Sequence, residues 1–420
     1  MRAYVKTFGC SSNRAETEII IGILRDSSIE ITDSLEDADA VIVNTCTVRG
    51  ETESRVLKYL RSLNGKRVIV TGCMVSIQPA LVALNSPAAS LVSIGNARSI
   101  PGVIRGGGRS VLLLESGALP DPAPFRMGLR SIIPISRGCL GSCSYCIVRH
   151  ARGHLRSSLK EKILASVEAA VRGGAREIWL TAQDTAAYGA DVGSSLPELL
   201  DSLTALSGDF MIRVGMFNPS SALKCLPALV KSFSPRTVYK FIHAPMQSGS
   251  DRVLKLMRRG YSVADFFGIV SEFRSRYRRI SLATDVIVGF PGEGDDDFEE
   301  TCTAILKLKP DKIHIARYSP RPHTAAASMD QVRENVKKER SRRLAAIKRE
   351  VQQEVNRSWV GETIEALALE LSRDGKALAR SREYKPIWVS GLGSGCLGKW
   401  VSVDVEACTP YSLSGRITRR

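Results

Sequence analysis

Residues 137–152 read RGCLGSCSYCIVRHAR and place Cys139, Cys143 and Cys146 in a Cys-x3-Cys-x2-Cys array. The array follows a short apolar run at residues 132–135, which predicts a strand that leads straight into a loop. Cysteines this close together in one loop can place three thiolates on one face of a metal centre. The stretch therefore predicts a metal site, and the rest of the chain indicates which kind of site it is.

The spacing of this array argues against two common metal sites. A structural zinc has four ligands, usually in two paired halves, and a ferredoxin-type run carries a fourth cysteine at a fixed offset. His150 and His154 lie nearby, but neither gives the spacing of a closed site. Three cysteines on a four-iron cluster leave one iron open for chemistry, so the array favours a reactive iron–sulfur centre over a zinc knuckle.

Three further cysteines each follow a predicted strand in the first part of the chain: Cys10, Cys46 and Cys73. The strands are expected at residues 4–8, 40–44 and 68–71, with helices at residues 13–25 and 51–63 between them. Alternating strands and helices predict an open parallel sheet, which collects its ligands at the carboxyl edge. These cysteines are therefore expected to converge on a second cluster site. The alternative is that they are inert core cysteines.

The central part of the chain repeats the alternation of strand and helix. Strands are expected at residues 177–180, 210–216, 239–242, 281–288 and 312–316. Polar residues gather after these strands, as at the active-site face of (β/α) barrels. This part is predicted to be a complete or partial (β/α) barrel.

The last ninety residues begin with a helix at 331–357 that has one apolar side and many basic residues. This helix is equally consistent with packing on the barrel and with contacting RNA. Short β segments follow at residues 363–371, 387–389 and 399–405, which predicts a small antiparallel barrel. The GxGxxG string at 393–398 has no helix after it and is interpreted as a turn rather than a dinucleotide site.

Composition limits the class of protein. The 420 residues are 44% hydrophobic, contain ten cysteines and carry a formal net charge of +16. No apolar run is long enough to span a membrane and the start does not resemble a signal peptide, so a cytoplasmic protein without a membrane partner is expected. Cysteines in a reducing compartment favour metal binding or catalysis, and the charge favours a polyanionic partner.

The cysteine array, with Tyr145 just before its last cysteine, resembles that of the radical S-adenosylmethionine (SAM) enzymes. Five further segments resemble the methylthiotransferase branch of these enzymes. They read TAQDTAAYGAD (181–191), RVGMFNP (213–219), HAPMQSGSDRVLKLM (243–257), TDVIVGFPGE (284–293) and YSPRP (318–322). The sequences of these segments most resemble those of the archaeal and eukaryotic members that act on tRNA. The C-terminal part of the chain resembles the TRAM domain.

The resemblance implies an α/β chain with a particular domain order. It consists of a methylthiotransferase domain with an open parallel sheet (1–125), a radical SAM partial barrel (126–330), a basic linker helix (331–358) and a TRAM-like β-barrel (359–420).

The resemblance also implies the reaction, which is methylthiolation of carbon 2 of N6-threonylcarbamoyladenosine next to the anticodon. The implied cofactors are SAM and two 4Fe–4S clusters. One cluster, on Cys139, Cys143 and Cys146, generates a SAM-derived radical, and a second carries sulfur on the other three cysteines, which are Cys10, Cys46 and Cys73. The implied partners are threonylcarbamoylated, ANN-decoding tRNA and an electron-donating reductant.

Some residue roles remain open between cofactor contact and scaffold. Tyr145, Gln183 and Asp184 are candidate SAM contacts, although Gln183 and Asp184 could simply cap a strand end. Residues 247–250 could be a helix start, and residues 289–292 an ordinary turn between strand and helix. A further possibility is methylthiolation of a ribosomal-protein side chain, and another is a non-catalytic iron–sulfur protein that binds RNA.

The sequence departs from the family pattern at two loops. Arg149-His150 stands where relatives usually carry a proline, and His323-Thr324-Ala325 stands where they usually have glycine, threonine and proline. Both departures leave the cysteine array intact and affect local geometry and substrate contact.

Overall fold

The computed structural model describes residues 1–63, 65–114, 128–372 and 374–418. Within them the chain divides into two compact units. The first unit comprises Met1–Ala175, Leu180–Gln183 and Ser319–Thr324, and the second comprises Arg176–Trp179, Asp184–Tyr318 and Ala325–Arg420. No helix in the described residues is long and apolar enough to cross a membrane.

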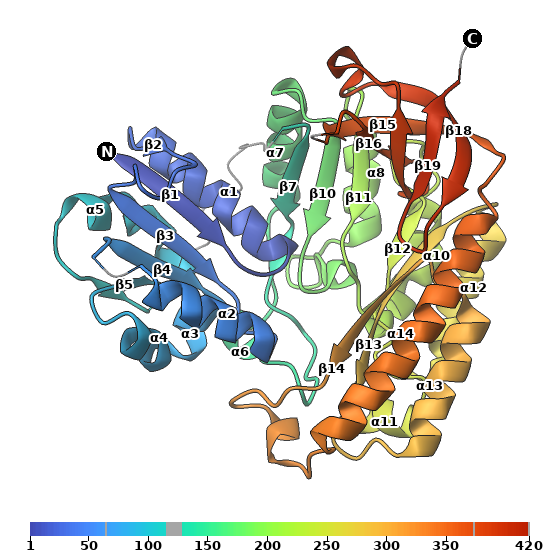
Figure 1. Cartoon of the computed structure of the whole chain (residues 1–420), viewed down its shortest axis with the longest axis horizontal. Helices are drawn as coiled ribbons and strands as arrows, with labels where there is room; N and C mark the ends of the chain where they lie inside the picture. The colour runs from blue at the N-terminus through green and yellow to red at the C-terminus, as the bar shows by residue number, and fades with distance from the viewer. Residues whose placement is uncertain (64, 115–127, 373, 419–420) are drawn as a thin grey trace. The chain divides into compact units, whose positions relative to one another are not determined.

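The first unit begins with a six-stranded parallel sheet of order β2-β1-β3-β4-β5-β6 (Figure 1). Its strands are β1 (Arg2–Thr7), β2 (Glu30–Ile31), β3 (Ala40–Thr45), β4 (Val68–Gly72), β5 (Ser90–Val92) and β6 (Val111–Leu112). Its helices are α1 (Ser11–Asp26), α2 (Gly50–Arg61), α3 (Cys73–Ile77), α4 (Pro79–Asn85), η1 (Ile94–Ser99) and α5 (Ile100–Arg105). The predicted open parallel sheet is confirmed.

Both faces of this sheet are covered by helices. On one face Ile42 and Ile69 pack with Ile20 and Leu24 of α1 and with residues of η1 and α5. On the other face, alternate residues of the same strands, such as Val43, pack with α2, α3 and α4. Because both faces are buried, β3 and β4 begin with continuous apolar runs, at residues 40–43 and 68–70, as the sequence suggested.

The remainder of the first unit carries the cysteine array. Its elements are β7 (Arg130–Pro134), β8 (Ser136–Arg137), α6 (Val148–Arg152), β9 (Arg156–Ser157) and α7 (Lys160–Arg172). The short strands β8 and β9 pair antiparallel and close the base of the cysteine loop. The expected domain boundary at residue 125 lies outside the described residues, and the boundaries at 125 and 330 stay predictions.

The second unit contains the rest of the α/β region. Its helices are η2 (Thr185–Ala187), α8 (Leu196–Thr204), α9 (Pro219–Ala222), η3 (Leu223–Cys225), α10 (Leu226–Ser232), α11 (Asp251–Leu256), α12 (Val263–Arg276), α13 (Asp295–Leu308) and η4 (Ala325–Ser328). Its strands are β11 (Met211–Val214), β12 (Phe241–His243), β13 (Ser281–Val288) and β14 (Lys312–Arg317), and β10 (Glu177–Thr181) contributes residues to both units. Strands β12, β13 and β14 form a parallel sheet.

The second unit ends in a helix and a closed barrel. Helix α14 (Glu334–Arg357) packs on β14 and α13, and the barrel has the order β15-β16-β17-β19-β18. The barrel elements are β15 (Thr363–Leu371), β16 (Ala377–Ser381), β17 (Pro386–Ser390), η5 (Ser394–Cys396), β18 (Trp400–Cys408) and β19 (Leu413–Ile417). The small barrel is confirmed, and so is the turn at 393–398. Among its described strands β17 and β19 pair in parallel, whereas the other neighbouring strands pair antiparallel.

Glu18 allows the packing of α1 against β7 to be tested by pH. Its buried carboxylate accepts a hydrogen bond from the Ile132 N–H at 3.2 Å. Burial raises the pKa of Glu18 to about 8, because desolvation outweighs that hydrogen bond and the attraction of Arg130. Since this folded-state pKa lies above the unfolded value, Glu18 contributes stability at low pH, and this contribution is lost as pH rises from about 4.5 to about 8.

Glu18→Gln keeps an acceptor for the Ile132 N–H but cannot ionise. The substitution should therefore raise the melting temperature progressively between roughly pH 5 and pH 8, and then by a constant amount. Thermal unfolding of both proteins across this range measures the effect. A difference in melting temperature that does not change with pH would contradict a buried, proton-binding Glu18.

Candidate functional site

The loop that carries the Cys-x3-Cys-x2-Cys array is held by its own backbone. The N–H of Cys146 donates to the carbonyl of Cys143 at 3.2 Å, and the N–H of Cys139 donates to the carbonyl of Gly153 at 3.3 Å. The N–H of Gly141 donates to Sγ of Cys139 at 3.2 Å. All three sulfurs therefore belong to one compact loop.

This loop leaves room for a group bound to the sulfurs. A Cβ at Gly141 would lie 3.3 Å from Sγ of Cys139 and 3.8 Å from Sγ of Cys143, so glycine keeps this side of the loop open. Burial, together with the neighbouring Cys143 and Cys139, raises the pKa of Cys146 to about 11. Thiols in this situation ionise together only when a positive group such as a metal cluster compensates their charge.

The structure brings the other three cysteines to the carboxyl edge of the N-terminal sheet. Cys46 directly follows β3, Cys73 directly follows β4 and begins α3, and Cys10 caps the start of α1. Burial raises the pKa of Cys46 to about 12, with further contributions from Cys73 and Cys10, which places the three thiols within electrostatic reach of one another. The three cysteines therefore meet at this edge of the sheet, and their role as ligands of one cluster stays a prediction.

Gly72 and two asparagines, Asn13 and Asn44, allow this convergence. Gly72 has φ of +90°, and a Cβ there would lie 2.4 Å from Oδ1 of Asn44, so the turn into Cys73 requires glycine. Asn13 Nδ2 donates to Oδ1 of Asn44 at 3.1 Å and to the carbonyl of Thr45 at 3.0 Å, and these groups are buried. Sequence inspection missed both asparagines, because nothing in their local sequence indicates that they meet.

A buried ion pair links the two cysteine-bearing segments. Arg152, at the end of α6, donates to Glu16 of α1 through Nη1 at 2.5 Å and Nη2 at 3.2 Å. Both side chains are almost completely buried. Burial by itself lowers the pKa of Arg152, but attraction to Cys73, Glu16 and Cys10 outweighs it and holds the value well above normal.

Arg152 also hydrogen-bonds the side chain of Cys73. A residue six positions after Cys146 in the first cysteine loop therefore reaches the second group of cysteines. The only sequence signal for this role was a basic residue close to the array, which is not specific enough to identify it.

Gln183 forms a second connection within the first unit. Its Oε1 accepts from the N–H of Gly138, next to Cys139, at 2.7 Å, and its Nε2 donates to Oγ of Ser12 at 3.2 Å. Gln183 therefore joins the start of the cysteine loop to the start of α1.

Asp184 holds neighbouring backbone within the second unit. Its buried carboxylate accepts from the Asn218 N–H at 2.9 Å and from Oγ of Ser221 at 2.7 Å. Burial raises the pKa of Asp184 despite these bonds. The contacts of Gln183 and Asp184 are those of scaffold residues, and SAM contact by Tyr145, Gln183 or Asp184 stays a prediction.

The YSPRP segment contributes a buried arginine to the first unit. Arg321 Nη2 donates to Oγ1 of Thr47 at 2.8 Å and to the carboxylate of Glu53. Thr47 directly follows Cys46, so Arg321 supports the loop that carries this cysteine. Its exposed neighbour His323 has φ of +63°, and its ring centroid lies 6.3 Å from that of His150. The two departures from the family pattern therefore lie side by side.

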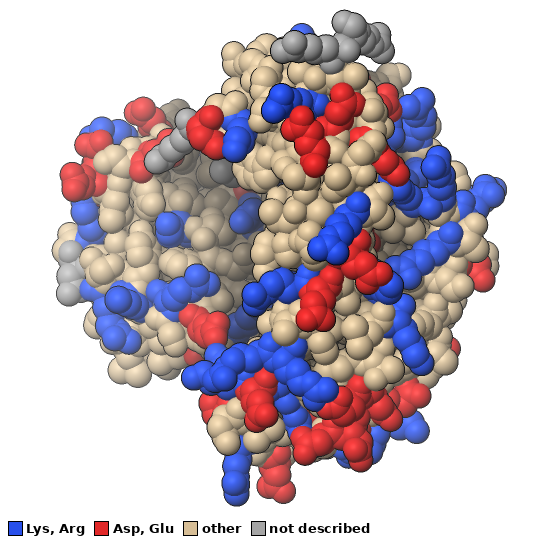
Figure 2. Space-filling model, turned by 45° about the vertical axis from the view of Figure 1, so that its right-hand side comes forward, with Lys and Arg blue, Asp and Glu red and all other residues tan. Residues whose placement is uncertain are grey.

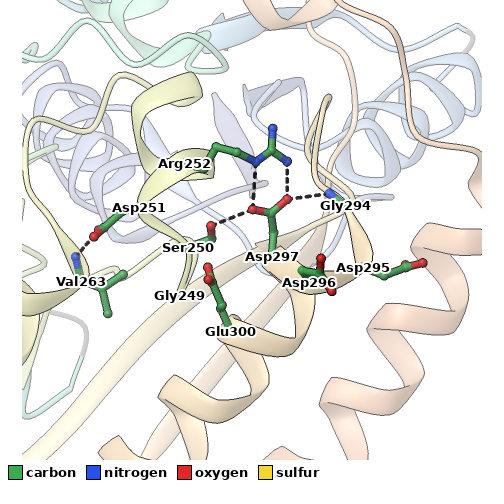
Figure 3. A pocket seen from close by; sticks show the side chains of 10 residues that line it. All are labelled: Gly249, Ser250, Asp251, Arg252, Val263, Gly294, Asp295, Asp296, Asp297 and Glu300. Carbon is green, nitrogen blue, oxygen red and sulfur yellow. Dashed lines mark hydrogen bonds and ion pairs between the residues drawn. The ribbon is translucent and has the colours of Figure 1, made fainter.

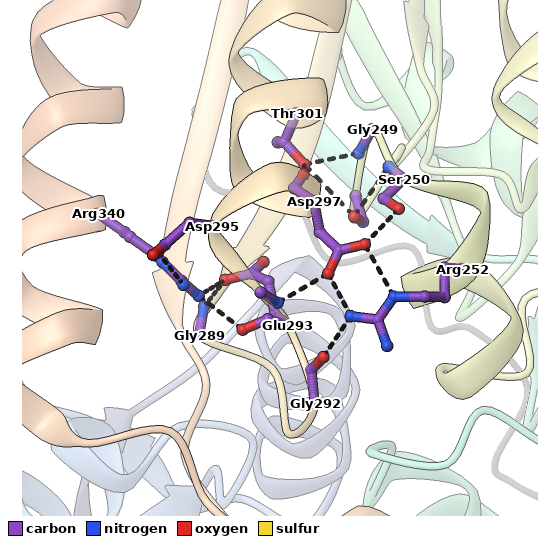
Figure 4. A network of polar contacts seen from close by, with 12 residues as sticks. Gly249, Ser250, Arg252, Gly289, Gly292, Glu293, Asp295, Asp297, Thr301 and Arg340 are labelled. Atoms are coloured by element: carbon purple, nitrogen blue, oxygen red, sulfur yellow. Dashed lines mark hydrogen bonds and ion pairs between the residues drawn. The ribbon is translucent and has the colours of Figure 1, made fainter.

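The two glycine-containing loops of the second unit are joined by a polar network (Figure 4). Asp297 accepts from Oγ of Ser250 at 2.7 Å, from Nε of Arg252 at 3.1 Å and from the N–H of Gly294 at 2.7 Å. Ser250 precedes α11 without capping it through its side chain. These contacts favour the scaffold interpretation of residues 247–250.

The loop at residues 289–292 is held in the same way. Glu293 accepts from the N–H of Gly289 at 2.6 Å and from Nη1 of Arg340 at 2.7 Å. Beside this network lies a surface pocket of about 530 Å³ lined by Ser250, Arg252 and acidic residues at the start of α13 (Figure 3). Its carboxylates face solvent or have partners within the protein, as Asp297 has Arg252 and Asp295 has Arg340.

Comparison with known proteins agrees with the fold and this site. Residues 2–93 match Uncharacterized protein family UPF0004, residues 133–305 match the Radical SAM superfamily and residues 357–418 match the TRAM domain. The fold and cysteine loop are thus those of a radical SAM enzyme.

Full-length relatives make the assignment more specific. The chain is 40% identical to a probable threonylcarbamoyladenosine tRNA methylthiotransferase of Methanothermobacter thermautotrophicus over 92% of this chain and 93% of the relative. It is 38% identical to a protein of the same name from Pyrococcus horikoshii, over 99% of both chains. It is 35% identical to the threonylcarbamoyladenosine tRNA methylthiotransferase of Danio rerio, over 99% of this chain and 78% of that one. The chain belongs to the threonylcarbamoyladenosine tRNA methylthiotransferase family, which confirms the resemblance.

Solved structures show the same fold at low sequence identity. The radical SAM methyltransferase TsrM from Kitasatospora setae superposes with a TM-score of 0.57 at 14% identity, covering 78% of this chain and 74% of that chain. The cobalamin-dependent radical enzyme OxsB gives a TM-score of 0.52 at 12% identity, covering 82% of this chain and 56% of that one.

Removing only one partner of the buried pair Arg152–Glu16 should strongly lower the free energy of unfolding. Arg152→Met leaves the Glu16 carboxylate buried without its partner, which typically costs about 3–5 kcal/mol of unfolding free energy. The double variant Arg152→Met/Glu16→Gln should recover a substantial part of this loss, because it removes both charges. Urea unfolding of the single and double variants measures the coupling.

Arg172 on α7 provides a matched control in the same unit. It forms an exposed i,i+4 pair with Glu168 at 3.6 Å, and Arg172→Met should change stability by less than about 0.5 kcal/mol. Equal losses for the two arginine variants would refute a structural role for the buried pair.

Proposed function

We propose that this protein replaces the hydrogen on carbon 2 of N6-threonylcarbamoyladenosine, next to the anticodon of tRNA, with a methylthio group. One observation carries this proposal. Two groups of three cysteines lie in a single compact unit and are linked by Arg152, in a chain whose relatives of nearly equal length bear the name of this activity.

We infer that two 4Fe–4S clusters are held by the six cysteines, one by Cys139, Cys143 and Cys146 and the other by Cys10, Cys46 and Cys73. With SAM they supply the radical and sulfur chemistry, which no side chain can replace, because an aromatic C–H is far too weak an acid for general base catalysis. Each group supplies three ligands, so a four-iron cluster would keep one open position.

The protein's own residues position and compensate these thiolates. Arg152 places a permanent positive charge among Cys10, Cys46 and Cys73, in a region where burial otherwise opposes ionised sulfur. Gln183 and the Gly141 N–H fix the backbone and one sulfur of the other loop. Such contacts orient metal ligands and tune the properties of the centre.

The polyanionic partner is tRNA, and the charge of the protein suits it. The net charge is +16, and on the face seen in Figure 2 basic side chains occur across the surface with acidic ones among them. A long nucleic acid can contact such scattered charges through many phosphates. A cytoplasmic location, ANN-decoding tRNAs as the specific substrates and an external electron donor belong to the same proposal.

Methylthiolation of a ribosomal-protein side chain is the less favoured alternative. The relatives that cover the whole chain are named for tRNA, and the chain ends in a TRAM domain.

The division of labour between the two cysteine groups can be tested by substituting one of them. The triple variant Cys10→Ala/Cys46→Ala/Cys73→Ala should lose the methylthio product but keep reductive cleavage of SAM to 5′-deoxyadenosine. Anaerobic reconstitution followed by iron analysis should give about half the iron of the native protein. Product is measured by mass spectrometry of threonylcarbamoylated tRNA.

The reciprocal variant Cys139→Ala/Cys143→Ala/Cys146→Ala is the matched control, and it should lose 5′-deoxyadenosine as well as the product. Cys302→Ala, which changes a buried cysteine outside both groups, should retain both activities. Continued methylthiolation by the Cys10/Cys46/Cys73 variant would refute the proposed sulfur-carrying role.

A further inference from the structure

Residues 54–114 of the first unit contain no acidic residue and eight basic ones. The basic residues are Arg55, Lys58, Arg61, Lys66, Arg67, Arg98, Arg105 and Arg109. The chain as a whole has 43 Asp and Glu residues, so a stretch of this length without one indicates a locally positive region.

Part of this charge lies at a surface pocket of about 500 Å³ in the N-terminal sheet domain. The pocket is lined by Arg98 and Ser99 of η1, by Val103 and glycines of α5 and the loop after it, and by Arg109 and Ser110, which directly precede β6. None of the described residues that line it is acidic. Two guanidinium groups and two hydroxyl groups therefore face one hollow, which suits an anion.

The arginines at this pocket are oriented by backbone carbonyls. Nε of Arg109 donates to the carbonyl of Ala89 at 3.1 Å, and Nη2 of Arg67 donates to the carbonyl of Val103, in the pocket wall, at 2.5 Å. Within the part of the chain that the structure describes, Arg67, Arg98 and Arg109 form no ion pair. A carbonyl orients a guanidinium but leaves its full charge in place.

Acidic residues that precede neighbouring strands do not line the pocket. Asp39 accepts from the backbone N–H of Arg2 at 2.7 Å. Asp26 precedes Ser27, whose carbonyl accepts from Arg105, but among the described residues Asp26 and Arg105 form no ion pair. The described carboxylates therefore leave the two pocket arginines unbalanced.

A glycine-rich loop adds backbone donors beside the arginines. Gly106 is right-handed helical, with φ of −69° and ψ of −7°, and Gly107 has φ of +77°. Residues of opposite hand in succession turn their N–H groups toward one side, which is a common way to hold an anion. The N–H groups of Gly107 and Gly108 meet no acceptor among the described residues. A Cβ at either position would meet no described atom within 4 Å, so a large ligand can approach this loop.

The carboxyl end of α5 opposes anion binding only weakly. A helix end of this kind carries partial negative charge on its free carbonyls. However, α5 has only six residues, and the carbonyls of Gly102 and Val103 are occupied by the Gly106 N–H, at 2.9 Å, and by Arg67. The two full charges of Arg98 and Arg109 therefore outweigh the helix dipole.

The pocket lies at the edge of the sheet opposite to the cysteines. Cys46 and Cys73 follow the carboxyl ends of β3 and β4, whereas Ser110 precedes the amino end of β6, and these strands are parallel. A strand of five residues separates the two edges by roughly 16 Å. A ligand that occupies the pocket while its reacting part lies at the cysteine edge must therefore be long, as a tRNA is.

We propose that this pocket binds phosphates of the tRNA backbone, with Arg98 and Arg109 as its charged groups and the N–H groups of Gly107 and Gly108 as further donors. The inference rests on the proposed function, because it takes tRNA as the substrate and adds a contact away from the reacting base. Guanidinium groups match the geometry of a phosphate, and phosphate contacts position a nucleic acid without reading its bases.

Binding of tRNA to the intact protein at several salt concentrations tests the proposal. The double variant Arg98→Met/Arg109→Met should bind threonylcarbamoylated and unmodified tRNA more weakly by the same factor, about ten-fold at low salt. The slope of log affinity against log salt concentration should become smaller by about two. Iron content after reconstitution and Tm should equal those of the native protein, because exposed arginines contribute little to stability.

Two controls separate a local site from an effect of net charge. Arg172→Met/Lys162→Met removes two exposed positive charges from α7 of the same unit and should keep the native slope. Gly108→Glu places a carboxylate in open space beside the pocket and should weaken tRNA binding, whereas Gly108→Ala adds only a methyl group and should not.

Three results would overturn the proposal. Equal losses for the two double variants would reduce the effect to net charge. A native salt slope in Arg98→Met/Arg109→Met would show that no phosphate is bound at this pocket. Binding of AMP to the native protein that this variant loses, with tRNA binding unchanged, would make the pocket a site for a small nucleotide.

Failure of this inference can be distinguished from failure of the proposed function. A native protein that forms methylthiolated product, while the Arg98→Met/Arg109→Met variant binds tRNA with native affinity, would overturn the inference alone. A reconstituted native protein that forms no methylthio product, although the same variant weakens tRNA binding as expected, would overturn the function alone.

Discussion

The buried ion pair between Arg152 and Glu16 is the constraint on which the first unit depends. Two charged groups removed from water are stable only with close geometry and further hydrogen bonds. Here two N–H groups of Arg152 donate to the Glu16 carboxylate, and Arg152 also contacts the side chain of Cys73. Because α6 follows Cys146 and α1 follows Cys10, the same pair fixes the ends of both cysteine segments. Arg152 thereby links two groups of cysteines. The loop cluster is formed by Cys139, Cys143 and Cys146, and the sheet-edge cluster by Cys10, Cys46 and Cys73.

The sheet-edge cluster illustrates how a parallel sheet gathers distant residues. Cys46 and Cys73 are twenty-seven positions apart, yet neighbouring strands in register bring them to one edge. Buried asparagines and a glycine of positive φ shape that edge. The loop cluster needs no such convergence, since its cysteines fall within eight consecutive residues. The two sites use the same ligand chemistry but depend on the fold to different degrees.

In the second unit ion pairs connect loops that carry none of the six cysteines. Its loops at residues 247–250 and 289–292 are held by ion pairs of Asp297 with Arg252 and of Glu293 with Arg340. These pairs connect neighbouring loops and so stabilise a scaffold.

The sequence by itself determined the strands, the alternation that makes a parallel sheet, the closed C-terminal barrel and both groups of cysteines. These follow from local properties: apolar runs of strand length, helical spacing, turn residues and short ligand spacings. Short strands such as β16 and β19 and the roles of Arg152, Asn13 and Arg321 were decided only by tertiary structure. Each of them depends on a partner far away in sequence, and the energy of a buried charge or hydrogen bond is set by that partner and its burial rather than by neighbouring residues.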